Sequence, residues 1–130
     1  MKSNAPTLYP NAAVAERVTA YSQEHSLALP AHISAYHAHV VENHPHSNYM
    51  ISNFQAQANV FLARAIGAKR VLEIGVYVGY SSMVWSHAVG SQGSVVGLEF
   101  SPDYAGEARR ALEKNGVGNV EIVEGDALQT

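Results

Sequence analysis

Cysteine is absent from all 130 residues of the sequence, and strongly basic residues are few. Without cysteine the chain has no disulfide, thiolate zinc site, iron–sulfur cluster or cysteine nucleophile. Its 8 lysines and arginines are outnumbered by 11 aspartates and glutamates, which gives a net charge of -3. This balance argues against a basic surface for nucleic acid and against a polybasic patch for membranes.

Long hydrophobic runs are missing as well. Nowhere do about 18 apolar residues follow one another, which is the length that a membrane-spanning helix needs. The segment Met1–Pro10 contains two prolines and no apolar run. We therefore expect neither a secretion signal nor a membrane span, and we predict a cytoplasmic protein.

The length and the apolar share of 47% are enough for one hydrophobic core, but the chain is too short for two ordinary domains. Residues 1–60 hold six of the seven histidines but only Lys2 and Arg17 as strong bases. This uneven distribution suggests two segments with different roles. We expect an N-terminal helical segment over residues 1–67 and the first half of an α/β domain over residues 68–130.

Capping residues and apolar spacing predict about three helices in the first segment. Asn11, Pro30 and either Ser52 or Asn53 are suitable residues for the helix starts. The helices are expected over about residues 11–25, 30–45 and 52–67.

The second segment alternates between short apolar runs and helical patterns. Residues 70–77 are rich in β-branched side chains and nearly all apolar, which is typical of a strand buried on both faces. Further strands are predicted over 94–100 and 119–126, with helices over 81–89 and 101–115. This order predicts an α/β fold with a parallel, doubly wound sheet and right-handed crossovers.

Ligands of such sheets bind beyond the carboxyl ends of the strands. The first strand leads into a loop that contains Gly75 and Gly79. Their spacing is Gly-x-x-x-Gly, whereas dinucleotide-binding sites use Gly-x-Gly-x-x-Gly. Two glycines can also serve only to turn the chain, so they do not identify a ligand by themselves.

Three carboxylates, Glu73, Glu99 and Asp126, fall at or near the ends of three successive strands. No lysine or arginine lies between Val71 and Ala108, so this end of the sheet should repel phosphate and attract a cation. Glu99 is placed to accept hydrogen bonds from both hydroxyls of a ribose. A ligand with a ribose and a positive charge but no phosphate is S-adenosylmethionine.

The segment Val71–Ser81, VLEIGVYVGYS, closely resembles the first motif of class I O-methyltransferases of the caffeoyl-CoA and catechol type, in particular fungal small-molecule relatives. Met50–Gln57 is similar to that family's Met-x-Ser-Pro-x-Gln-Gly-Gln segment, although Asn53 and Ala56 stand where the family has proline and glycine.

Two later segments extend the resemblance. Residues 97–101 are similar to the family's ribose-binding segment, and residues 124–128 are similar to its adenine-side segment. The resemblance covers roughly residues 30–130. It implies a Rossmann-like methyltransferase fold, of which this chain contains the N-terminal cofactor-binding half.

The resemblance also implies which residues meet the methionine portion of the cofactor. Glu73 and Gly75 would line that portion, and Met50 and Ser52 would close its side. Ser81, at the start of a helix with free amide groups, would take the cofactor carboxylate.

The remaining implied contacts are aromatic or on the adenine side. Tyr77 and Tyr80 would wall the sulfonium, since an aromatic face tolerates a desolvated cation. Phe100 would cover one face of adenine, and Asp126 with the backbone of Ala127 would meet its amino edge. For the three aromatic residues, ordinary packing in the core remains an alternative.

Relatives transfer the methyl group to a phenolic or catecholic oxygen with a divalent cation, usually Mg²⁺. The family supplies two aspartates and an asparagine as ligands from strands after the third, and this sequence stops at Thr130. We therefore assign no catalytic residue and no metal ligand, and we expect a truncated, inactive form. Strand 70–77 would then have a bare edge and an uncovered face, which a homodimer could cover.

Four histidines, His37, His39, His44 and His46, are close enough in sequence to suggest a zinc or copper site. Residues two positions apart on a helix point in different directions, however. Ordinary hydrogen bonding is therefore the preferred interpretation of these histidines.

Taken together, the patterns and the resemblance predict an S-adenosylmethionine-dependent O-methyltransferase that acts on a small phenolic substrate and releases S-adenosylhomocysteine. A non-catalytic interaction or dimerisation module of the same fold is the first alternative. The second is a domain that binds NAD, which the missing glycine fingerprint and the acidic strand ends disfavour.

Overall fold

A computed structural model describes residues 9–129, so the predictions for residues 1–8 and for Thr130 lie outside the described part. The elements are α1 (Ala12–Glu24), α2 (Ala31–Asn43), the 3-10 helix η1 (Ser47–Tyr49), α3 (Asn53–Ala65), β1 (Arg70–Ile74), α4 (Tyr80–Val89), β2 (Ser94–Glu99), α5 (Pro102–Lys114) and β3 (Val120–Glu124). Each predicted helix and strand is present. The strands are shorter than expected, and η1 was not predicted.

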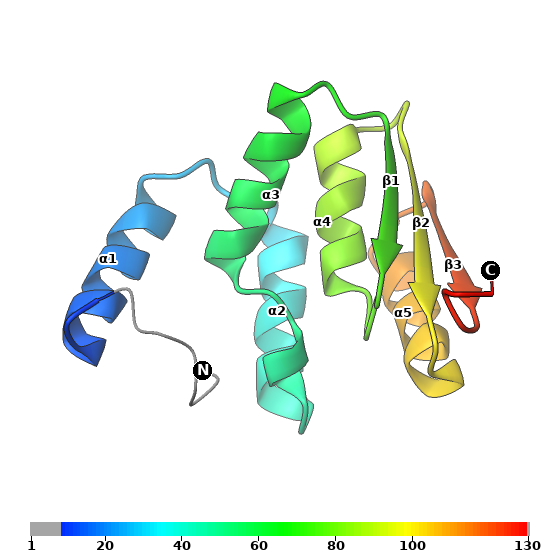
Figure 1. The fold of residues 1–130 in the computed structure, drawn as a ribbon, viewed down its shortest axis with the longest axis horizontal. Helices are drawn as coiled ribbons and strands as arrows, with labels where there is room; N and C mark the ends of the chain where they lie inside the picture. Colours follow the sequence, from blue (N-terminus) through cyan, green and yellow to red (C-terminus); the bar gives the residue numbers. More distant parts are fainter. Residues whose placement is uncertain (1–8, 130) are drawn as a thin grey trace.

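Side-chain caps fix the starts of two N-terminal helices. The Asn11 side chain accepts a hydrogen bond from the Val14 N–H at 2.9 Å, which begins α1 where the sequence predicts. The Ser52 hydroxyl accepts from the Gln55 N–H at 3.1 Å, so Ser52, and not Asn53, caps α3. Among these helices α1 buries no side chain, and it lies beside α3 at one end of the molecule (Figure 1).

The three strands form one parallel sheet in the order β1-β2-β3. Glu73 pairs with Gly97 in the register between β1 and β2, and Glu99 pairs with Glu124 between β2 and β3. Two right-handed crossovers that step in the same direction place their helices on the same face of a sheet. Helices α4 and α5 do lie on one face, and α2 and α3 pack beyond α4 (Figure 1).

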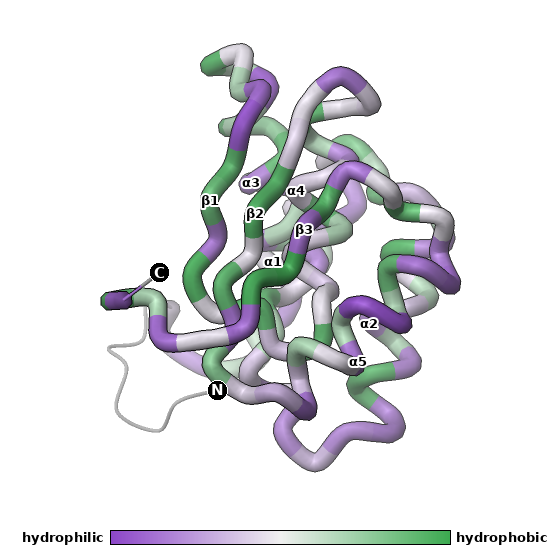
Figure 2. Tube along the Cα trace, turned by 90° about the vertical axis from the view of Figure 1, so that its right-hand side faces the viewer, coloured by the Kyte–Doolittle hydropathy of each residue, from purple (hydrophilic) through white to green (hydrophobic). Residues whose placement is uncertain are grey.

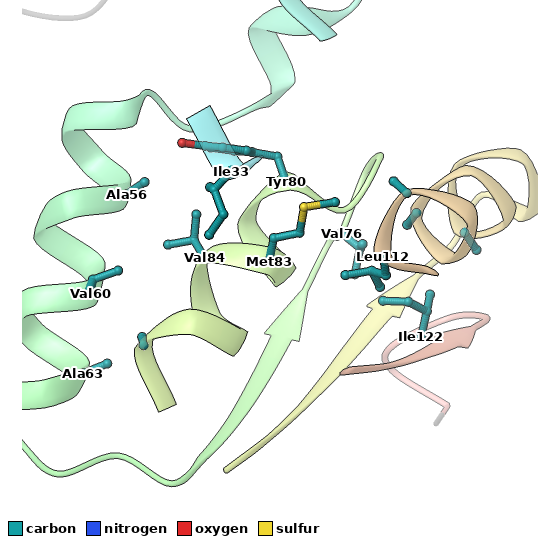
Figure 3. Packing of buried hydrophobic residues seen from close by; sticks show 14 residues of the cluster. Ile33, Ala56, Val60, Ala63, Val76, Tyr80, Met83, Val84, Leu112 and Ile122 are labelled. Atoms are coloured by element: carbon teal, nitrogen blue, oxygen red, sulfur yellow. The ribbon is translucent and has the colours of Figure 1, made fainter. Parts of the chain in front are cut away.

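The hydrophobic core lies between this covered face and the helices. Met83 and Val84 of α4 lie between the side chains of α3 and those near the sheet, such as Val76 and Ile122 (Figure 3). Helix α5 contributes mainly small residues, because Ala105, Ala108 and Ala111 form its buried row. Small side chains let α5 approach the sheet closely.

The opposite face of the sheet is bare within the described residues. Leu72 and Ile74 of β1 are 64% and 71% exposed, and no described strand pairs with the outer edge of β1. Figure 2 looks onto this face, with the apolar strand traces in front and the helices behind. The expected burial of β1 on both faces is therefore wrong, and the expected bare edge and uncovered face are confirmed for this part of the chain.

The fold class is confirmed as a parallel α/β sheet of Rossmann-like type, present in part. Because only one face carries helices, the described sheet is not wound on both sides. No helix within residues 9–129 is long and apolar enough to cross a membrane.

Gly97 provides a test of how closely the loop after β1 approaches the sheet. A Cβ at Gly97 would lie 2.5 Å from Val76 Cγ2 and 3.1 Å from Ile122 Cδ1. We expect Gly97→Ala to lower the free energy of unfolding by roughly 1–3 kcal/mol through overpacking. Urea denaturation measures this change.

Gly118→Ala is the matched control, because a Cβ there meets nothing within 4 Å. Its free energy of unfolding should change by less than about 0.5 kcal/mol. Equal effects of the two substitutions would contradict the packing described here.

Candidate functional site

The loop from Gly75 to Gly79 joins β1 to α4 and has an unusual backbone. Gly75 and Gly79 have φ angles of 85° and 91°, and Tyr77 has a φ of 56°. Tyr77 is the only non-glycine residue with a positive φ among residues 9–129. This conformation costs a tyrosine about 1–2 kcal/mol. Backbone strain of this kind is concentrated at functional sites.

The Glu99 carboxylate, at the end of β2, holds this loop in place. Its Oε2 accepts hydrogen bonds from the N–H groups of Val76 and Tyr77 at 2.9 and 2.8 Å. Its Oε1 accepts one from the Ser101 N–H at 2.9 Å, and the residue is only 8% exposed. A carboxylate has about four acceptor positions, so one remains for a ligand hydroxyl.

The sequence predicts a ligand-binding role for Glu99 and misses its bonds to the loop backbone. The tight loop could have indicated these bonds, because its amide groups cannot join a strand or a helix and need an acceptor nearby. A carboxylate at the end of the neighbouring strand is the residue that the parallel register brings closest.

Glu73 points toward helix α4. Its carboxylate accepts hydrogen bonds from the Ser82 hydroxyl and from Trp85 Nε1, the latter at 3.2 Å. The side chain is 9% exposed, and burial raises its pKa above the usual range for a glutamate. Glu73 thus forms the buried floor of the site and does not project into solvent.

A cleft of about 340 Å³ opens above Glu73 at the carboxyl end of β1. It brings together six of the predicted site residues: Met50, Glu73, Gly75, Tyr77, Tyr80 and Ser81. Seven further residues line it that the sequence did not assign to the site: Tyr49, Ile51, Asn59, Leu72, Ile74, Val76 and Trp85. Tyr49, Asn59 and Trp85 lie outside the quoted motifs, and they come from separate elements that meet only in the folded chain.

The N-terminus of α4 faces the same cleft through Ser81. Gly79 is the N-cap of this helix and has no side chain with which to cap it. The first N–H groups of a helix have no partner inside the helix, and they attract an anionic group. This end of the cleft can therefore bind a carboxylate.

The two predicted tyrosines are buried. Tyr80 is 1% exposed, and its hydroxyl donates a hydrogen bond to the Asn53 side-chain oxygen. Its ring packs edge-on against His37 with ring centres 4.8 Å apart. Tyr77 packs edge-on against Tyr104 at 4.7 Å. Burial raises the pKa of both phenols, so both stay neutral. Tyr77 and Tyr80 therefore both pack in the core and line the cleft.

Five predicted site residues are absent from the cleft lining: Ser52, Glu99, Phe100, Asp126 and Ala127. Ser52 is occupied as the cap of α3. Phe100 follows β2 and is 77% exposed. Asp126 follows β3 and accepts a hydrogen bond from the Leu128 N–H at 3.0 Å across the turn that contains Ala127.

The histidines have separate partners. His44 Nε2 lies 2.8 Å from Glu107 Oε1, His39 contacts the Asn43 side chain, and His37 packs against Tyr80. Burial lowers the pKa of His37. In the part of the chain that the structure describes, no three histidine, aspartate or glutamate side chains are grouped to hold a metal ion.

Comparisons with known proteins agree on one family. The sequence model of a family described as O-methyltransferase matches residues 23–130. The protein named O-methyltransferase ankF from Aspergillus thermomutatus is 36% identical over 118 residues, which are 89% of this chain and 49% of that protein. A catechol O-methyltransferase from Mycobacterium tuberculosis is 44% identical over 81 residues, which are 62% of this chain and 37% of that protein.

A solved structure is similar over nearly the whole chain. The SAH-bound methyltransferase PaMTH1 from Podospora anserina has a TM-score of 0.87 and 34% sequence identity, covering 95% of this chain and 53% of its own. This chain thus spans about half the length of these relatives or less.

The raised pKa of Glu73 predicts a pH dependence of stability. The folded state holds the Glu73 proton more tightly than the unfolded state, so ionisation favours unfolding. As the pH rises from the ordinary glutamate value of about 4.5 through the higher folded value, the wild type should lose stability relative to Glu73→Gln. At pH values above the pKa of Glu73 in the folded state, the difference in free energy of unfolding between the two proteins should stay constant. Urea denaturation of both proteins between about pH 4 and pH 8 measures it.

Glu121→Gln, at an exposed position of β3, is the control. Its free energy of unfolding should change with pH in the same way as that of the wild type. Parallel curves for the wild type and Glu73→Gln would contradict the assigned burial of Glu73.

Proposed function

Because the chain belongs to the O-methyltransferase family, we propose that it supplies the S-adenosylmethionine-binding half of an enzyme that methylates a hydroxyl of a small phenolic or catecholic molecule. The main support is the Glu99 carboxylate, which holds a strained glycine loop beside the cleft and keeps an acceptor position for a ligand. The related PaMTH1 structure is SAH-bound.

The chemistry of the cleft fits the parts of this cofactor. S-adenosylmethionine supplies an activated methyl group on a positively charged sulfur. Glu73 provides a buried negative group below the cleft, and the N-terminus of α4 at Ser81 provides amide donors for the carboxylate. Glu99 is the proposed acceptor for one ribose hydroxyl, through the acceptor position that the backbone amides leave. No lysine or arginine between Val71 and Ala108 is available to bind a phosphate.

The adenine side of the site is a further part of the proposal. Phe100 and Asp126 follow the ends of β2 and β3, which are neighbours in the sheet. We propose that Phe100 covers one face of adenine and that Asp126 and the backbone of Ala127 meet its amino edge. The exposed ring of Phe100 gains a partner in this arrangement.

Groups for the methyl acceptor and for a divalent cation such as Mg²⁺ are proposed to belong to the part of the relatives that this chain does not match. Residues 9–129 contain no grouped set of metal ligands. The phenolic substrate, the dimer and the cytoplasmic location stay predictions of the sequence.

A non-catalytic interaction module is the second candidate. It is favoured by the exposed side chains of Leu72 and Ile74 and by the unpaired edge of β1 in the described sheet. A folded dimer without affinity for S-adenosylhomocysteine would support it. The alternative of an NAD-binding domain is dropped, because the chain belongs to the O-methyltransferase family.

Calorimetric titration with S-adenosylhomocysteine tests the proposed site. The wild-type chain should bind this compound and should not bind NAD. Glu99→Gln should weaken binding by roughly tenfold to a hundredfold, because it removes a charged acceptor that also holds the loop.

Glu121→Gln serves as the control, since Glu121 is also a glutamate near the end of a strand but is exposed on β3 and lies outside the predicted adenine-side segment. Its affinity should equal that of the wild type. An unchanged affinity of Glu99→Gln, or preferential binding of NAD, would refute the proposal.

Methyl transfer is a separate prediction. The 130-residue chain, incubated with S-adenosylmethionine, catechol and Mg²⁺, should give no methylated product above the protein-free background, because the acceptor and cation groups are proposed to lie elsewhere. Mass spectrometry of the products measures this. Turnover by the 130-residue chain would overturn that part of the proposal.

A further inference from the structure

Helix α2 makes a polar contact with the glycine loop through Tyr36. The Tyr36 hydroxyl donates a hydrogen bond to the Val78 carbonyl at 2.7 Å, although the two residues are 42 positions apart in sequence. Val78 is fully buried and immediately precedes the cap of α4. Tyr36 therefore acts on the peptide that leads into the helix facing the cleft.

Gly79 allows the peptide between Val78 and Gly79 to rotate. Gly79 has a φ of 91°, and glycine adopts either sign of φ at little cost. Rotation of the peptide between Val78 and Gly79 would redirect the Val78 carbonyl and the Gly79 N–H together. The Gly79 N–H lies directly before the first turn of α4, which starts at the next residue.

Two hydrogen bonds fix one orientation of the peptide. The Gly79 N–H donates to the Val76 carbonyl at 3.2 Å, and the Tyr36 hydroxyl holds the Val78 carbonyl. The first bond lies within the loop, whose Val76 and Tyr77 N–H groups are held by Glu99. The second comes from a separate helix, so Tyr36 ties this peptide directly to α2.

Helix α2 is itself well anchored near the loop. Val40 is fully buried and packs with Tyr77 and Val78. Just beyond the end of α2, His44 lies 2.8 Å from the Glu107 carboxylate of α5. Burial, with the nearby charge of Glu107, raises the pKa of the Tyr36 hydroxyl, so it stays protonated and remains a donor.

We propose that Tyr36 is a positioning residue for cofactor binding, whose hydroxyl holds the peptide between Val78 and Gly79 so that the loop and the first turn of α4 face the cleft in one arrangement. The inference rests on the proposed function, because the cleft is taken to bind S-adenosylmethionine. Fixing the loop before binding removes an ordering cost that the ligand would otherwise bear.

The substitution Tyr36→Phe removes one oxygen and keeps the ring. We expect it to weaken binding of S-adenosylhomocysteine to the 130-residue chain by roughly fivefold to tenfold, the effect of one lost hydrogen bond. In the ligand-free protein, amide hydrogen exchange should become faster at Gly79, Tyr80 and Ser81. Exchange in β2 and β3 should remain close to that of the wild type.

Tyr104→Phe is the matched control. Tyr104 packs against the Tyr77 ring but does not line the cleft, so its variant should keep the wild-type affinity and loop exchange. A purely structural role of Tyr36 would speed exchange in all strands alike and leave the affinity unchanged. That outcome, or equal losses in both variants, would overturn the proposal.

Two further outcomes are separable. If the wild type does not bind S-adenosylhomocysteine, the proposed function fails, and loop exchange in Tyr36→Phe alone decides whether Tyr36 orders the loop. If Tyr36→Phe does not fold, amide resonances of Val76 to Gly79 in the wild type provide the test. One set of resonances is expected, and two interconverting sets would contradict the proposal.

Discussion

The hydrogen bonds from three backbone amides to the buried Glu99 carboxylate are the interaction on which the site depends. They join the end of β2 to the loop after β1, and thereby set the start of α4. Without an acceptor, the loop amides would be buried unpaired, and the left-handed conformation of Tyr77 would have nothing to offset its cost. The same carboxylate compensates its own burial through these bonds.

The three carboxylates that appear equivalent in the sequence have different surroundings in the fold. Glu73 is turned onto α4 and is desolvated, Glu99 is bonded to backbone amides, and Asp126 accepts hydrogen bonds within the turn after β3. Only Glu73 and Glu99 are buried. Of the two, Glu73 lines the cleft, while Glu99 holds the loop beside it.

Local signals in the sequence predict most of the fold because caps and periodicity act over a few residues. Asn11 and Ser101 begin α1 and α5 as expected, and the parallel order of the strands follows from their alternation with helices. Burial of β1 on both faces could not be decided this way. It depends on what covers Leu72 and Ile74, and within residues 9–129 nothing does.

Five of the six predicted site residues in the cleft lie in the continuous segment Val71–Ser81, so the motif that predicted them also keeps them together, and Met50 joins them from the segment before α3. The contacts that the sequence misses are long-range. Tyr36 reaches Val78 only when α2 packs against the loop, and Trp85 reaches Glu73 only when α4 packs against β1. Ser52 was assigned to the ligand, but its hydroxyl is used as a helix cap, a role that its position before a helix also allowed.

The most direct test of this account is to map where S-adenosylhomocysteine binds on the isotope-labelled chain by following amide resonances during a titration. The account predicts that the largest shifts fall on the loop from Gly75 to Gly79, on Ser81 and on Phe100. Shifts concentrated at the opposite end of the sheet, around His32 and Asn115, or no shifts at ligand concentrations that saturate related proteins, would contradict it.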